Sequence, residues 1–312
     1  MLVLTRFRDM ALAGVGVVAV TLAGCTGPAA TPSPTATSRS AAAATGGASL
    51  SPSTSASPSP ALARPTSPSP SAAAASPSAT DGSGLATLAA AAEQPLAAAT
   101  YVADIKPENF PTPTTIDNSY YPRLPGTRYI YQGNGIDGPE TITMEVTRDT
   151  KMVNGIKTVV VHDFVTRSGK LAEDTYDWYA QDKDGNVWYL GEDTHKLDDK
   201  SGTLTDTKGS WEFGKDNAQP GIIMPGKPKV GETYRQEYRK GEAEDQATIL
   251  KTDDTATVKA GSYKTVVRTK DFSDLDPSVV EEKLFAPGVG FISVEHVKGP
   301  PEKIELVKIE KF

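Results

Sequence analysis

The sequence predicts a mainly β fold: a single antiparallel β domain, built as a curved sheet or a partly open barrel, after a disordered linker. The composition changes near residue 100 from Ala, Ser, Thr and Pro to a mixture with charged and aromatic residues. Beyond that point apolar and polar residues alternate in one segment after another. Gly and Pro separate these segments, as they do in antiparallel sheets.

The first 24 residues have the layout of an export signal. Arg6 and Arg8 make the start basic, and Met10–Ala23 is an almost unbroken apolar run. This run has about 14 residues, whereas a helix that spans a bilayer needs about 20. We therefore expect residues 1–24 to be a signal peptide that is removed, and nothing later in the chain is apolar enough to span a membrane.

Leu22-Ala23-Gly24-Cys25 follows this run and contains the only cysteine of the chain. The four residues resemble the lipobox of bacterial lipoproteins. The resemblance implies that Cys25 becomes the first residue of the mature protein and carries a lipid on its sulfur. The membrane would then be a partner through Cys25, at its extracytoplasmic face, because two acyl chains anchor a protein stably. A lone cysteine also leaves the exported domain without a disulfide.

Residues 25–100 are predicted to be a disordered linker. Eleven of the 24 prolines lie between residues 26 and 100, among Ala, Ser and Thr. Such a segment buries too little apolar surface to offset the loss of chain entropy. Residues 101–312 should therefore form the extracytoplasmic domain.

The charge of that domain excludes one class of partner. The first 100 residues contain four basic and three acidic residues, so residues 101–312 hold 28 Lys or Arg and 36 Asp or Glu, a net charge of −8. Nucleic acid binding calls for a basic face. We therefore expect no nucleic acid partner.

Alternating segments predict the strands of this domain. The strongest hairpin signal is Asn154-Gly155, between the alternating run 140–148 and an apolar run 156–165. One helix is expected over 276–284, with Asp276 as N-cap and Pro277 at the first helical position. Residues 217–228 are expected to be a loop that plugs the core or covers a cavity as a lid. Further strands are predicted at 128–132, 231–240, 246–252, 255–259, 262–270, 290–297 and 303–312.

The hairpin 171–194 holds two of the three tryptophans and a group of carboxylates. A three-residue loop closed by Gly185 would pair Ala180 with Trp188 and Tyr176 with Glu192. A two-residue turn at Asp184-Gly185 would instead oppose the carboxylates of Asp177 and Glu192, which is destabilising. We prefer the first register, which puts five residues on one face: Tyr176, Trp178, Ala180, Trp188 and Leu190.

Two kinds of site are compatible with this hairpin. Glu192, with Asp174 and Asp193 close in sequence, forms a candidate catalytic set if burial raises a carboxyl pKa. Tyr176, Trp178, Trp188 and Glu192 form a candidate ligand-binding set, because Tyr and Trp line sugar or apolar pockets. The alternative is that the aromatic residues are core and the acids a solvated rim. Asp182, Asp184 and Asn186 resemble the start of a calcium loop, but Gly185 comes too early, which favours a plain turn.

Other chemical motifs do not occur in the sequence. It contains no G-x-S-x-G, no H-E-x-x-H and no phosphate-binding glycine loop. His162, His195 and His296 are far apart, and none has a second histidine at ligand spacing. We therefore expect surface or structural histidines, no metal and no cofactor.

Three segments, 178–192, 209–225 and 285–290, resemble a group of uncharacterised bacterial exported proteins without an assigned activity. The sequence thus favours a membrane-anchored cell-surface lipoprotein whose β domain is a non-enzymatic binding module for an envelope ligand, which is a lipid, a glycan or a protein. The alternative is a hydrolase of cell-envelope polymers that uses Glu192 with Asp174 or Asp193, and it requires two carboxylates that converge across a cleft.

Overall fold

The computed structural model describes residues 101–198 and 200–312. The predictions for the signal peptide, for Cys25 and for the linker lie outside these residues. Within the described ranges, the first element is the short 3-10 helix η2, Pro107–Asn109, and all the others are strands. None of the described helical segments is long and apolar enough to cross a membrane.

The domain is one antiparallel sheet of fifteen strands, which confirms the predicted mainly β class. The strands are β1 (Thr127–Gly135), β2 (Gly138–Val153), β3 (Ile156–Arg167), β4 (Lys170–Gln181), β5 (Val187–Leu197), β6 (Leu204–Asp206), β7 (Trp211–Glu212), β8 (Gln219–Met224), β9 (Thr233–Arg235), β10 (Glu237–Tyr238), β11 (Asp245–Val258), β12 (Gly261–Ser273), β13 (Val280–Ala286), β14 (Gly290–Lys298) and β15 (Lys303–Lys311).

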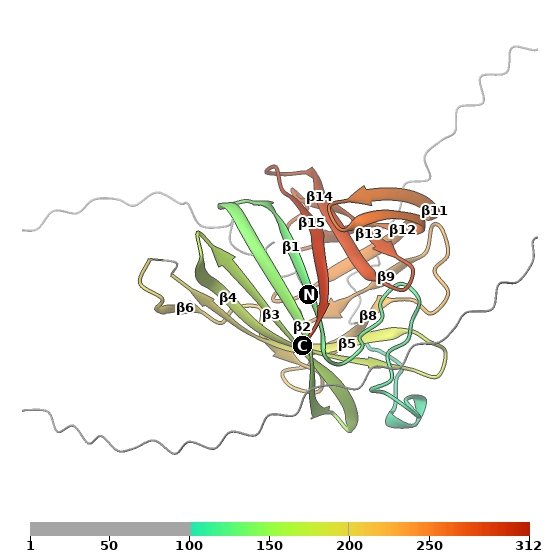
Figure 1. The fold of residues 1–312 in the computed structure, drawn as a ribbon. Helices are drawn as coiled ribbons and strands as arrows, with labels where there is room; N and C mark the ends of the chain where they lie inside the picture. Colours follow the sequence, from blue (N-terminus) through green and yellow to red (C-terminus); the bar gives the residue numbers. More distant parts are fainter. Residues whose placement is uncertain (1–100, 199) are drawn as a thin grey trace, which may run out of the picture. The chain divides into compact units, whose positions relative to one another are not determined.

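The sheet curls until its two ends meet in one chain segment (Figure 1). The path runs β10-β8-β5-β4-β3-β2-β1-β15-β14-β13-β12-β11-β9, while β6 and β7 pair with β5 beside it. Its terminal strands, β9 and β10, are separated only by Gln236. Because β9 pairs with β11 and β10 pairs with β8, residues 233–238 link both ends of the path. The result is a nearly closed barrel, the second of the two predicted forms.

Two segments differ from the prediction. Residues 276–284 are not a helix: Ser278 closes a turn on the Asp276 carboxylate, and β13 follows from Val280. Residues 217–228 contain the strand β8 in place of the expected loop, but they do fill the core, since β8 pairs with β5 and buries Ile223 and Met224. In β13 the buried residues alternate as Glu281, Lys283 and Phe285. Its inward face is therefore partly charged, so the sequence of this strand lacks the alternation of apolar and polar residues that is typical of a strand.

The coil that precedes β1 closes one end of the barrel (Figure 1). The backbone of Pro113 accepts a hydrogen bond from Gln181 at the end of β4, and that of Ser119 accepts one from Gly288 in the β13–β14 turn. The amide of Asn118 donates to the carbonyls of Gly185 and Pro225, 2.9 and 3.1 Å away. We call residues 110–126 the plug.

The plug also places a cation in the core. Arg123 is 1% exposed, and its guanidinium carbon lies 3.5 Å from the ring centroid of Tyr121. The Tyr121 ring in turn packs edge-on against Tyr179, with the centroids 5.6 Å apart. Cation–π contacts of a desolvated arginine contribute about 2 kcal/mol. Arg123 therefore fastens the plug to the inner wall.

Candidate functional site

The inner wall of the barrel changes from apolar to ionisable with distance from the plug. Strands β3, β4, β5, β12 and β13 each carry a buried apolar or tyrosine side chain near the plug and a buried carboxylate further along the same inward face. The alternating positions are Val161 and Asp163, Tyr179 and Asp177, Tyr189 and Glu192, Val267 and Asp271, and Phe285 and Glu281. Carboxylates are rarely this deeply buried, so this half of the interior is the candidate functional site.

Asp177 and Glu192 lie directly opposite each other on β4 and β5. The predicted three-residue loop is present, since Asp182 and Asn186 pair around it and Ala180 faces Trp188. The predicted pairing of Tyr176 with Glu192 is nevertheless wrong. A bulge between Tyr189 and Glu192 shifts the register by one residue.

Gly191 makes this bulge possible. Its φ is 137°, and a Cβ atom there would lie 2.3 Å from the backbone oxygen of Trp211. A residue with a side chain does not fit this conformation or this space. One glycine thus brings the two carboxylates together although the turn register alone keeps them apart.

Burial changes the protonation of this group. Burial, with a smaller contribution from the nearby Asp177, raises the pKa of Asp163 to about 7. Burial also raises the pKa of Glu192 well above its ordinary value, again with a contribution from Asp177. The hydroxyl of Thr194 donates to Glu192 over 2.9 Å and opposes that shift. Asp163 can therefore hold or release a proton near neutral pH.

The predicted catalytic carboxylates do not converge. Glu192 is 2% exposed and points into the barrel, where it contacts Thr194. Asp174 and Asp193 lie on the outer face instead, next to His162 at 2.5 Å and His195 at 3.7 Å respectively. Strand alternation explains the separation, because neighbours in sequence point to opposite faces of a sheet.

The predicted aromatic face is only partly present. Trp178, Ala180, Trp188 and Leu190 share a buried cluster on the outer side of the sheet, together with Phe110. Tyr176 is 38% exposed and stacks on His162, with the centroids 4.4 Å apart. The two tryptophans are thus mainly core, and the four predicted ligand-binding residues do not line one site.

A shallow depression brings some of the predicted residues together. It has a volume of about 260 Å³ and is bordered by Trp178, Glu192 and Asp193 beside β7. Lys151 spans it, with its ammonium 3.0 Å from the Trp178 ring centroid and 2.9 Å from the Glu212 carboxylate. The tryptophan face that would stack on a sugar is therefore occupied by a lysine.

The calcium-like turn is a plain turn, as expected. The Asp182 carboxylate accepts hydrogen bonds from the backbone of Asp184 and Asn186, from the Asn186 amide and from the Trp188 indole. Both oxygens of the Asp182 carboxylate thus accept hydrogen bonds within the hairpin, and neither points to a cation site.

Asp163, Asp177, Asp271 and Glu281 were not predicted as site residues. Each is a buried carboxylate at an inward position of its strand, beside apolar or aromatic residues on β3 and β4 and beside further polar residues on β12 and β13. The signal was present for Asp163, which alternates with Val161 and Val165 in the run 156–165. An acidic residue among apolar residues on one strand face indicates a polar barrel interior if that face points inward. The alternation of residue types alone does not tell which face points inward.

No protein-family model matches this chain, and no curated protein matches it. Two solved structures resemble it. One is a candidate exported protein with a YmcC-like fold from Bacteroides fragilis, with 14% identity and a TM-score of 0.38, covering 62% of this chain and 100% of that one. The other is a candidate lipoprotein from Parabacteroides distasonis, with 11% identity and a TM-score of 0.30, covering 62% of this chain and 99% of that one. Both likenesses are too distant to assign a family or a function.

Proposed function

We propose that this protein is a cell-surface lipoprotein, anchored to the extracytoplasmic face of the membrane by a lipid on Cys25, and that its barrel is a non-enzymatic binding module for an envelope ligand. The anchor rests on the sequence Leu22-Ala23-Gly24-Cys25 after an export signal. The binding role rests on the barrel itself.

One observation carries the binding role: the barrel is closed at one end by the plug, and buried carboxylates gather toward the other end. Burying a carboxylate costs free energy even where it gains partners, as Asp177 does from the Tyr189 hydroxyl and Glu192 from the Thr194 hydroxyl. A fold that served only as a spacer would gain stability from apolar residues at these positions. The ionisable wall is therefore better explained by a ligand that contacts it.

The chemistry of the wall favours a polar ligand. Asp163, Asp177 and Glu192 are acceptors when ionised and can donate one hydrogen bond each when protonated. Thr175 and Thr194 add buried hydroxyls, 3.1 Å apart across β4 and β5. Hydroxyl and ammonium groups match such a surface, whereas an acyl chain does not. Among a lipid, a glycan and a protein, this favours a glycan or the polar head of a lipid.

Membrane fractionation tests the anchor. The wild-type protein should enter the detergent phase, and Cys25→Ser should move to the aqueous phase because the acceptor of the acyl chains is gone. Ser38→Ala in the linker serves as the matched control and should stay in the detergent phase. If Cys25→Ser partitions like the wild type, the lipoprotein assignment is wrong.

Thermal unfolding with separated envelope fractions tests the binding role. A fraction that contains the ligand should raise the Tm, since a ligand at 100 times its Kd stabilises the folded state by about 2.7 kcal/mol. Glu192→Gln should reduce this shift, and Asp193→Asn on the outer face should not. Equal shifts in both variants would contradict binding inside the barrel.

The pair Asp177 and Glu192 also supports a second candidate function, hydrolysis of an envelope polymer with Glu192 as general acid. The raised pKa of Glu192 is what such an acid needs. In that case Glu192→Gln would abolish polymer turnover while the Tm stayed near the wild-type value. A binding module would show no turnover to lose.

A further inference from the structure

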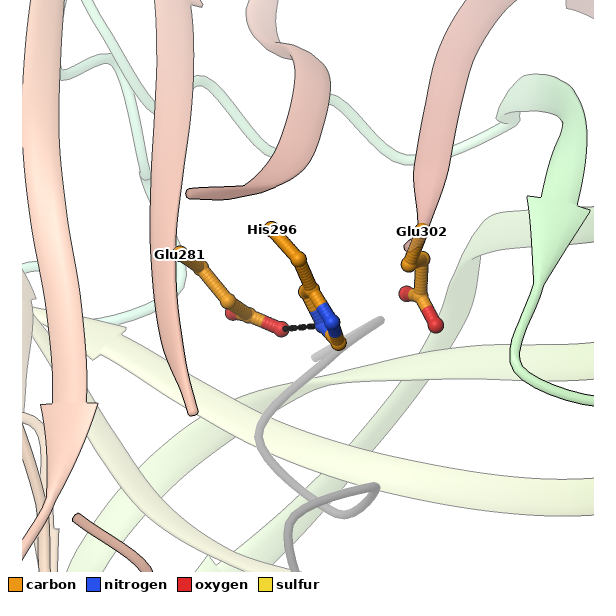
Figure 2. A group of neighbouring side chains, drawn as sticks. All are labelled: Glu281, His296 and Glu302. Atoms are coloured by element: carbon orange, nitrogen blue, oxygen red, sulfur yellow. Dashed lines mark hydrogen bonds and ion pairs between the residues drawn. The ribbon is translucent and has the colours of Figure 1, made fainter. Parts of the chain in front are cut away.

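A group of buried side chains that shares Glu281 with the ionisable wall lies where β13, β14 and β15 approach each other. It consists of Glu281 at the start of β13, His296 near the end of β14, and Glu302 directly before β15 (Figure 2). The side chains of Glu281 and His296 are 1% and 2% exposed, and Glu302 is 3% exposed. One oxygen of each carboxylate and one imidazole nitrogen all lie within 4.8 Å of one another.

We propose that Glu281, His296 and Glu302 bind a divalent transition-metal ion of the zinc type. Zinc is held by imidazole nitrogen and carboxylate oxygen at about 2.0–2.2 Å, which places tetrahedral ligand atoms about 3.3–3.5 Å apart. The Nε2 atom of His296 already lies 3.1 Å from Oε1 of Glu281. Modest side-chain movement therefore completes a three-ligand site.

The backbone fixes the three positions. Glu281 and His296 are cross-strand partners on β13 and β14. The backbone N–H of His296 donates to the carbonyl of Glu302 over 3.0 Å. Because both contacts are made by the main chain, the ligands face one another before any ion arrives, and only side-chain torsions have to adjust.

The imidazole has the orientation of a metal ligand. Its Nδ1 atom lies 2.7 Å from the carbonyl oxygen of Pro300. A carbonyl only accepts hydrogen bonds, so Nδ1 carries the proton and Nε2 faces the two carboxylates (Figure 2). Metal-bound histidines usually donate their other N–H in this way, which fixes the tautomer.

The charge of the surroundings favours a cation. Lys283 lies 2.9 Å from Asp271 and 3.2 Å from Glu281, so one ammonium serves two carboxylates. Glu302 adds a third carboxylate, on the other side of the imidazole (Figure 2). Carboxylate oxygens therefore lie on both sides of the imidazole, close enough to be shared with it by one ion. The nitrogen ligand selects zinc-like ions over Mg²⁺ and Ca²⁺, which prefer oxygen alone.

Calorimetric titration of the chelator-treated full-length protein with Zn²⁺ tests the site. The wild type should bind one ion per chain, and Mg²⁺ and Ca²⁺ should give no comparable binding. His296→Gln should weaken Zn²⁺ binding by about tenfold or more. His195→Gln is the matched control, because His195 lies on the outer face beside Asp193, and it should bind like the wild type.

The alternative is that His296 is an imidazolium held by Glu281 and Pro300 without a metal. In that case no saturable Zn²⁺ binding appears, or His195→Gln weakens it as much as His296→Gln, and either result overturns the proposal. If His296→Gln fails to fold, Glu302→Gln takes its place: a similar loss supports the site, and wild-type affinity contradicts it. The outcome does not depend on whether the barrel binds an envelope ligand.

Discussion

Asp163 shows how one buried residue makes the stability of this barrel depend on pH. Its side chain lies on the inward face of β3, between Val161 and Val165. Water cannot solvate the carboxylate there, so the neutral form is favoured and the pKa rises from 3.8 to about 7. The folded protein therefore holds a proton that the unfolded chain has already released.

This pKa predicts the sign of the pH dependence. Between about pH 4 and pH 7 the native state binds more protons than the unfolded state, so the free energy of unfolding falls as the pH rises and levels off above about 7. Asp163→Asn should flatten this slope and stabilise the protein at pH 8. Part of the pH dependence should remain in Asp163→Asn, because burial also raises the pKa of Glu192.

Urea unfolding at pH 5 and pH 8 measures this effect. The exposed residue Asp193 provides the control variant, Asp193→Asn, which should keep the wild-type slope. If the free energy of unfolding changes between pH 5 and pH 8 by the same amount in Asp163→Asn as in the wild type, Asp163 is ionised at both pH values.

At the scale of single strands, the bulge in β5 decides which side chains meet. Gly191→Ala should destabilise the protein by more than about 3 kcal/mol, because a strained φ adds to the contact with the Trp211 backbone. Gly169→Ala is the matched control: its φ is 76°, but nothing lies within 4 Å of the added Cβ. It should cost about 1–2 kcal/mol.

Chemical denaturation of the two glycine variants measures this difference. Equal losses would mean that β5 accepts a side chain at the bulge, and the pairing of Asp177 with Glu192 would then need another explanation.

The turns and strands also show which local structures the sequence can predict. Asn154-Gly155 and the Gly185 loop were predicted correctly, because their turn chemistry is local. The bulge at Gly191 was missed, since it depends on the approach of β7, which is distant in sequence. The strand β13 was taken for a helix because Asp276 and Pro277 fit a helix start, whereas in the structure the Asp276 carboxylate closes a turn before the strand.

The candidate site could be predicted only in part, for a related reason. Glu192 was selected from the sequence, and the structure places it in the polar wall. Asp174 and Asp193 were selected because they are near in sequence, yet strand alternation sends them to the outer face. Glu281 and His296 meet through cross-strand pairing, which no spacing rule for helices or loops detects.

At the scale of the whole domain, the chain builds a barrel that is closed at one end and ionisable toward the other. The plug contributes Tyr121 and Arg123 to the core, and residues 233–238 join the two ends of the sheet. Because the wall is one continuous sheet, the carboxylates on β3, β4 and β5 keep fixed positions relative to one another. Such a rigid wall suits recognition of a ligand.

The central claim is that this wall binds a ligand of the cell envelope, and native mass spectrometry of the full-length protein isolated from its own envelope tests it most directly. We expect a bound molecule of defined mass on the wild type, depleted in Glu192→Gln and retained in Asp193→Asn. A protein mass without a bound molecule, or equal occupancy in both variants, would contradict it.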